Sequence, residues 1–269
     1  MTRSPLIALG VLGLAVIACS SRRPIEEIER DIYAADPIER QGLVVELRGH
    51  GVAAVPAWIE MFDNEAKNLS LHVVAAAELY DLGPDAAQAV PTLVEVLREG
   101  FFGREMDPHP DVIERFEHED KGRKHAREVL KAIGAASVGA VRGVLADSRD
   151  RSRQEAAVTL GQIGGDASVA MGDLVGMLND EDKAVVAAAM WALGEIGAVA
   201  EVESTVLTGL VTALGDESWV VRLEAIKALG KFNTKAVPVR GEVMKLVDDP
   251  VVEVANHAVH ALELIKAPE

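Results

Sequence analysis

The stretch ALGEIG at residues 192–197 belongs to a pattern that recurs along this chain and decides its fold. Close copies are TLGQIG at 159–164 and ALGKFN at 228–233. Five of the six intervals between successive copies are 30 to 36 residues long. A period of this length is typical of stacked two-helix units. The leucines at the common position are Leu47, Leu79, Leu130, Leu160, Leu193, Leu229 and Leu262.

Residues 217–231 (ESWVVRLEAIKALGK) show what one helix of such a unit looks like. Glu224, Lys227 and Lys231 lie at positions i, i+3 and i+7, which makes one polar stripe on a mostly apolar helix. A helix of this kind is buried on most of its circumference. One helix pair cannot cover so wide an apolar surface, but stacked neighbours can.

The residue types at the helix ends predict where each helix begins and stops. Asp216 and Asp249 are expected N-caps, with Pro250 in the first turn of the second helix. At the other end, we expect glycines in a left-handed conformation, which lacks a steric cost for glycine. The glycines expected in this role are Gly83, Gly134, Gly164 and Gly197.

These units resemble HEAT repeats of the short bacterial type, which are also found in phycobilisome lyases. The resemblance covers residues 37–269, with residues 25–35 as an N-terminal capping helix. It implies an all-α, right-handed α-solenoid of about seven helix pairs. The repeated residues are those that pack, so the resemblance concerns architecture rather than function.

The first 21 residues, MTRSPLIALGVLGLAVIACSS, contain the only cysteine of the chain. The apolar run before it is shorter than the roughly 20 residues that a membrane-spanning helix needs, and it suits the core of a signal peptide. Its end, Val16-Ile17-Ala18-Cys19, resembles the bacterial lipobox. This resemblance implies cleavage before Cys19 and attachment of lipid, including palmitate, to its thiol. An uncleaved anchor or an ordinary secretory peptide is the alternative.

We therefore predict three segments: a lipoprotein signal peptide at 1–18, a lipidated tether at 19–24 and a HEAT-like repeat array at 25–269. The short tether would hold the folded part close to a membrane. The predicted location is the cell envelope. Ser20 favours the periplasmic face of the outer membrane, by analogy with enteric sorting.

The composition excludes some classes of function. The formal net charge of the chain is −16 at pH 7, which argues against a nucleic-acid partner because such binding depends on Lys and Arg. Hydrophobic residues make up 49% of the chain and aromatic residues only 4%, so small side chains supply most of the core. This balance favours closely packed helices.

An insertion at about 100–120 (GFFGREMDPHPDVIERFEHED) interrupts the period. It is acidic, whereas residues 121–153 contain nine Lys or Arg and three acidic residues. In one interpretation the insertion folds over the basic helices. In the other, the basic residues dock an acidic partner or lipid headgroup, with phenylalanines as anchors and the insertion as a movable cover. The residues predicted to bind this partner are Phe101, Phe102, Phe116, Arg123, Lys124, Arg127, Arg151 and Arg153.

Histidines in this region raise the question of a metal site. On a helix, His118 and His125 would lie about 10 Å apart along the axis, whereas Zn²⁺ needs three or four ligands about 2 Å away. We therefore predict solvated side chains and no metal. The other residues considered for this site are His109, Glu119 and Asp120.

The chain lacks the catalytic motif of a known family of HEAT-like enzymes. Di-iron deoxyhypusine hydroxylases carry His-Glu pairs six and five residues before the anchor leucine. The equivalent pairs here include Lys124-His125 and Asn256-His257, and none is His-Glu. The chain also has no GxSxG or Walker A sequence. We predict no enzyme activity and no cofactor.

The predicted function is a noncatalytic, membrane-anchored scaffold or adaptor that binds an unknown protein or peptide of the cell envelope through its repeat surface. The alternative is an enzyme or enzyme-accessory protein with a ligand or metal site near 101–125. A third possibility is a structural protein that self-associates through its ends. Trp191, Trp219, His257 and His260 either pack or contact a partner, and the sequence leaves this open.

Overall fold

The computed structural model describes residues 22–63, 69–99 and 112–266. Within these ranges the chain forms α-helices and short 3₁₀ segments, and no strand occurs. None of the described helices combines the length and the apolar character of a membrane span. Four residues of interest lie outside the described ranges: Cys19, Phe101, Phe102 and His109.

The chain divides into two compact units, residues 1–57 and 58–269, and each is treated by itself. The first unit contains α1 (Ile25–Ala34), α2 (Pro37–Arg48) and η1 (Gly51–Ala54). Helix α1 confirms the predicted first helix. Asp36 caps α2, since its Oδ1 accepts hydrogen bonds from the backbone N–H of Ile38 at 2.8 Å and of Glu39 at 3.0 Å.

The second unit begins within α3 and contains the remaining helices. Its α-helices are α3 (Val55–Asp63), α4 (Leu69–Leu82), α5 (Val90–Glu99), α6 (Val112–Ile133), α7 (Ala135–Arg142), α8 (Asp150–Ile163), α9 (Met171–Gly176), α10 (Lys183–Val199), α11 (Ser204–Ala213), α12 (Trp219–Phe232), α13 (Arg240–Met244) and α14 (Val252–Leu264). Its 3₁₀ segments are η2 (Gly83–Ala89), η3 (Gly143–Ala146), η4 (Gly164–Ala170), η5 (Met177–Asn179), η6 (Asn233–Val239) and η7 (Lys245–Asp248).

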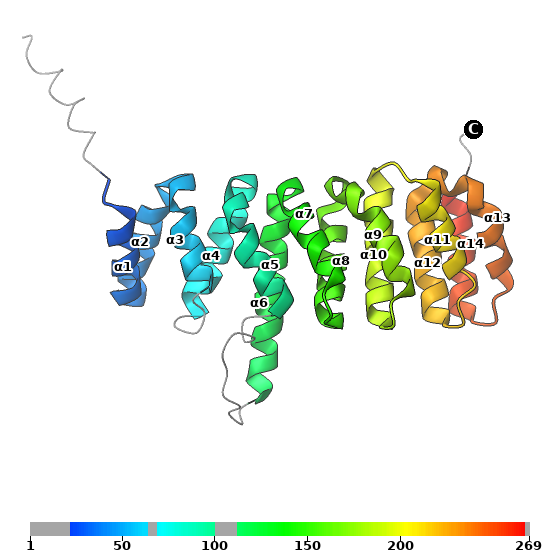
Figure 1. The fold of residues 1–269 in the computed structure, drawn as a ribbon, viewed down its shortest axis with the longest axis horizontal. Coiled ribbons are helices and arrows are strands. Elements are labelled where there is room, and N and C mark those ends of the chain that lie inside the picture. Colours follow the sequence, from blue (N-terminus) through cyan, green and yellow to red (C-terminus); the bar gives the residue numbers. More distant parts are fainter. Residues whose placement is uncertain (1–21, 64–68, 100–111, 267–269) are drawn as a thin grey trace, which may run out of the picture. The chain divides into compact units, whose positions relative to one another are not determined.

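Within the second unit, α4, α6, α8, α10, α12 and α14 pack against one another in that order. Figure 1 shows these helices standing side by side, each with its odd-numbered partner. With α1 and α2 counted as one pair, the described residues contain seven helix pairs. The prediction of an all-α solenoid is confirmed.

The anchor leucines explain why this stack forms. They all lie on the even-numbered helices, Leu47 on α2 of the first unit and the other six in the second unit. Leu262 is half-buried because it lies on α14, the last helix of the described stack. The other six are at most 1% exposed: Leu47, Leu79, Leu130, Leu160, Leu193 and Leu229.

The glycine predictions hold at three of four places. Gly83, Gly134 and Gly164 have positive φ angles of 53°, 68° and 73° and end α4, α6 and α8. The prediction for Gly197 is wrong, because α10 continues through it to Val199. A methyl group on Gly197 would overlap the ring of Phe232 on α12, so this glycine serves helix packing instead.

The two predicted aspartate N-caps lie in turns just before the helices. Asp216 accepts a hydrogen bond from the N–H of Ser218 at 2.8 Å, and Asp249 accepts one from the N–H of Val251 at 2.9 Å. The N-cap prediction is wrong, because α12 begins at Trp219 and α14 at Val252, three residues after each aspartate, so the N-caps are Ser218 and Val251. Pro250 therefore precedes the first turn and does not belong to it. Aspartates in this role stabilise the turn itself.

The insertion at about 100–120 contributes to a helix. Its second part forms the start of α6, which is 22 residues long and runs unbroken through Gly122. Figure 1 shows α6 extending beyond the ends of α5 and α8. Residues 112–120, which interrupt the sequence repeat, therefore lengthen α6 at its N-terminal end.

Candidate partner-binding groove

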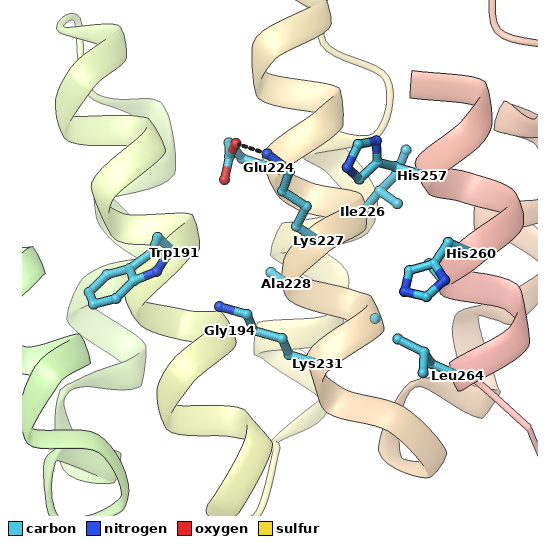
Figure 2. A pocket seen from close by; sticks show the side chains of 12 residues that line it. Trp191, Gly194, Glu224, Ile226, Lys227, Ala228, Lys231, His257, His260 and Leu264 are labelled. Carbon is cyan, nitrogen blue, oxygen red and sulfur yellow. Dashed lines mark hydrogen bonds and ion pairs between the residues drawn. The ribbon is translucent and has the colours of Figure 1, made fainter. Parts of the chain in front are cut away.

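Three successive even-numbered helices, α10, α12 and α14, border a groove with a volume of about 220 Å³. Its floor consists of small residues: Gly194, Ala228, Gly230 and Ala261. A Cβ on Gly194 would lie 3.1 Å from Cα of Ala228, which shows how closely α10 and α12 approach. Since the helices need small residues to pack this way, the floor is apolar and lies below the side chains beside it (Figure 2).

The polar stripe predicted on α12 lines this groove. Lys227 donates a hydrogen bond to Oε1 of Glu224 at 2.8 Å. Lys231 pairs with Glu195 of α10, and its ammonium lies 5.8 Å from the centre of the Trp191 ring. A cation at this distance from an indole is attracted to the ring face. The stripe is thus held by residues of two helices.

Two imidazoles come from α14. Nδ1 of His257 donates to the carbonyl of Glu253 at 2.8 Å, which leaves its Nε2 as the acceptor in the neutral ring. His260 is exposed, and its Nδ1 lies 3.8 Å from Oε2 of Glu263. Figure 2 shows both rings on the side of the groove opposite Trp191. The groove therefore combines an apolar floor with aromatic, cationic and imidazole side chains.

Trp191 and Trp219 have different roles. Trp191 lines the groove, and its ring also covers Gly161 of α8. Trp219, the first residue of α12, is partly exposed and does not line the groove. The sequence left both roles open, and the structure makes Trp191 the candidate contact residue.

Three of the arginines that were predicted to bind a partner make contacts within the fold. Arg123 is 7% exposed and donates to the carbonyls of Leu97 and Arg98 at the end of α5. Arg127 pairs with the buried carboxylate of Glu155 on α8. These guanidinium groups hold α6 against α5 and α8.

Arg153 is the third of these arginines. It donates two hydrogen bonds to Asp180, at 2.7 and 2.9 Å, which connects α8 to the turn before α10. Arg151 is more exposed and lies 2.9 Å from Glu155, and Lys124 is exposed. Phe116 lies on α6. Partner binding by these residues stays a prediction.

The structure also joins two histidines that the sequence does not relate. Nδ1 of His72 on α4 donates to the carbonyl of Phe62 on α3 at 2.9 Å, and Nε2 of His72 lies 2.9 Å from Nδ1 of His125 on α6. Burial lowers the pKa of His72 to about 4. Burial, Lys124 and Lys121 lower the pKa of His125. Since 53 residues separate the two histidines, no local pattern indicates their contact.

The described residues contain no group of three or more His, Cys, Asp or Glu side chains placed to hold a metal ion. His118 and His125 lie on the same unbroken helix, α6, as the estimate of their separation assumed.

Comparisons with known proteins agree with this architecture. A family model described as HEAT repeats matches residues 207–269. No curated protein sequence matches the chain. The complex of CpcE and CpcF of phycocyanin lyase from Nostoc sp. PCC7120 is similar in structure, with 20% identity and a TM-score of 0.51 over 65% of this chain and 98% of that chain.

Two further structures extend the likeness. The archaeal HEAT-like repeats protein from Thermococcus onnurineus NA1 has 13% identity and a TM-score of 0.51 over 90% of this chain and 97% of that one. Kap121p has 15% identity and a TM-score of 0.57 over 90% of this chain and 32% of Kap121p. At these identities the likeness shows the fold alone. The protein is an all-α solenoid of helix pairs whose residues 207–269 match the HEAT repeat.

Proposed function

We propose that this protein is a noncatalytic scaffold or adaptor, anchored to a membrane of the cell envelope, that binds a protein or peptide through the α10–α12–α14 groove. The observation that carries the proposal is the lining of the groove: Trp191, Lys227 and His260 from three helices surround one apolar floor. Tryptophan is enriched among the residues that dominate binding energy, and polar groups around such an anchor provide specificity.

The chemistry of the groove supports binding over turnover. Lys227 and Lys231 both have carboxylate partners, and the groove contains no hydroxyl or thiol nucleophile. Lysine and carboxylate side chains can also act as nucleophiles, but here Lys227 is paired with Glu224 and Lys231 with Glu195. Kap121p, which has a similar fold, has been solved bound to Nup53p, so this architecture is compatible with a protein ligand.

The proposed anchor is the thiol of Cys19, on the strength of the lipobox resemblance. We expect Cys19→Ser to abolish incorporation of labelled palmitate and to move the protein from the membrane to the soluble fraction, because a chain without acyl groups lacks the hydrophobic contribution of about 0.8 kcal/mol per buried CH₂. Fractionation and labelling of cells that express each form check this. Unchanged labelling in Cys19→Ser would remove the lipoprotein proposal and leave the groove untouched.

The groove is tested by site-specific photocrosslinking in cells. A photoreactive residue in place of Lys227 should give a protein adduct of defined mass, and one in place of Met244, exposed on α13, should not. Trp191→Ala should lower the affinity for the partner at least about tenfold, since a central tryptophan contributes on the order of 2 kcal/mol to the binding free energy. Trp219→Ala is the matched control, because this tryptophan is exposed outside the groove.

Two outcomes would contradict the groove as the binding site. One is an equal adduct from position 244, and the other is an adduct that survives both Trp191→Ala and Lys227→Glu in variants that keep their melting temperature. A photoreactive residue at position 124 tests the predicted basic docking surface in the same experiment.

A further inference from the structure

The histidine pair joins three helices of the second unit. His72 on α4 packs its ring against Phe62 of α3, with 4.4 Å between the ring centres, and against His125 of α6, with 5.1 Å between the ring centres. His72 is 1% exposed, whereas His125 is half-buried. Two imidazoles of such different exposure share one hydrogen bond.

The carbonyl of Phe62 fixes the tautomers of both rings. A carbonyl only accepts hydrogen bonds, so Nδ1 of His72 must carry a proton. In the neutral ring, Nε2 of His72 is then an acceptor, and Nδ1 of His125 must donate to it. A first added proton can go to Nε2 of His125 without disturbing either bond. A second proton, on Nε2 of His72, would place two N–H donors against each other.

We propose that this pair makes the α4–α6 interface proton-sensitive: the interface stays closed while His72 is neutral and opens when His72 takes up a proton. This property goes beyond partner binding and does not depend on which ligand occupies the groove. The proposal rests on geometry: the ring of His72 on α4 is held by the Phe62 carbonyl and contacts the ring of His125 on α6.

The surrounding charges act in the same direction. Burial, opposed by the Phe62 carbonyl and aided by His125, lowers the pKa of His72 to about 4 from 6.5. Lys124 and Lys121 on α6 disfavour a further positive charge on His125.

Two buried carboxylates lie on the elements that pack against α6, Glu78 of α4 and Glu155 of α8. Glu155 of α8 pairs with Arg127 and Arg151. Glu99 of α5 lies 3.6 Å from Arg149, and Asp85 of η2 is exposed.

The sign follows from linkage. Above pH 6.5 His72 is neutral in both the closed and the open interface, so protons do not favour opening. As the pH falls from 6.5 to 4, His72 becomes protonated in the open form but stays neutral in the closed form. Protonation therefore shifts the equilibrium toward the open form. Between pH 7.5 and pH 4.5 the opening equilibrium of α4 and α6 should rise on the order of 50-fold.

The experiment uses the full chain in detergent. Imidazole ¹⁵N spectra should show His72 with an unprotonated Nε2 at pH 7 and a titration midpoint near 4. Amide exchange, corrected for intrinsic rates, should report the 50-fold rise in residues 72–82 and 121–133. Residues 150–163 of α8 are the internal control, because Arg153 lowers the pKa of Asp180 and keeps this pair ionised at pH 4.5.

Variants isolate the histidine. In His72→Asn the acid-induced opening of α4 and α6 should fall well below the wild-type rise, because the fully buried ring is gone and only the half-buried His125 still titrates there. His260→Asn, which removes an exposed histidine on α14, should keep the full rise. The proposal is overturned if His72 of the folded wild-type chain titrates near 6.5, or if the 50-fold rise persists in His72→Asn. The titration of His72 uses the wild-type chain. It can therefore refute the proposal even if His72→Asn folds poorly.

Discussion

The α8–α10 and α4–α6 interfaces hold neighbouring helix pairs together by different chemistry. Between α8 and α10, Gly161 lies under Trp191 and Ala192, and the Arg153–Asp180 pair closes one end. Between α4 and α6, two imidazoles meet beside a backbone carbonyl. The first contact leaves no room for a methyl group, and the second depends on the position of one proton.

The difference predicts different vulnerabilities. A glycine-packed interface is sensitive to added volume, because protein interiors are close-packed and cannot absorb an extra atom without moving helices. It is insensitive to mild acid, because the pKa of Asp180 lies below its usual value of 3.8. The imidazole interface responds to acid because its buried ring must stay neutral. The α8–α10 interface is thus sensitive to added volume, and the α4–α6 interface is sensitive to acid.

The largest effect is expected from Gly161→Ala. The new Cβ would lie 2.5 Å from Cζ3 of Trp191 and 2.8 Å from Cα of Ala192, so α8 and α10 must separate. We expect a loss of about 2 to 3 kcal/mol in the free energy of unfolding, measured by urea denaturation. Gly139→Ala on α7 is the matched control, because nothing lies within 4 Å of its Cβ.

The control should move in the opposite direction. Alanine favours the helix over glycine by about 0.5 to 1 kcal/mol, so Gly139→Ala should stabilise the protein. Equal effects of the two substitutions would show that glycine at 161 serves no packing role, and the contrast between the interfaces would lose its basis.

A smaller effect is expected from Arg153→Ala. Asp180 would lose two hydrogen bonds from a guanidinium group while remaining nearly buried, which costs about 2 kcal/mol. Its pKa should also rise toward the usual value, as carboxyl NMR would show. Lys183→Ala should change stability by less than about 0.5 kcal/mol, because Lys183 is 62% exposed and 3.8 Å from Asp216. A similar loss in both variants would contradict the special role of the Arg153–Asp180 pair.

Part of the candidate groove was accessible from the sequence. The stripe of Glu224, Lys227 and Lys231 follows from helical periodicity, and the structure places all three residues along the groove. Their neighbours Trp191 and His260 come from other helices. Which faces meet depends on the rotation of each helix in the stack, and a single helix pattern contains no such information.

Gly197 and Arg123 show the same limit. Gly197 has the residue type of a helix end, yet α10 continues through it to Val199, and the glycine instead makes room for the ring of Phe232 on α12. Arg123 lies in a strongly basic stretch, yet it bonds to the last carbonyls of α5. In both cases, a contact with another helix overrides the local signal.

The sequence by itself determined the helix pairs and their leucine cores, because periodicity and residue type act over a few turns of one helix. The tertiary structure decided the groove, the Arg153–Asp180 pair and the contact of His72 with His125. These features join residues that are 27 to 53 positions apart along the chain, or lie on successive repeats, and exist only after the helices stack. The physical reason is that burial and close approach, which set the pKa of His72 and require glycine at 161, are properties of the packed helices together.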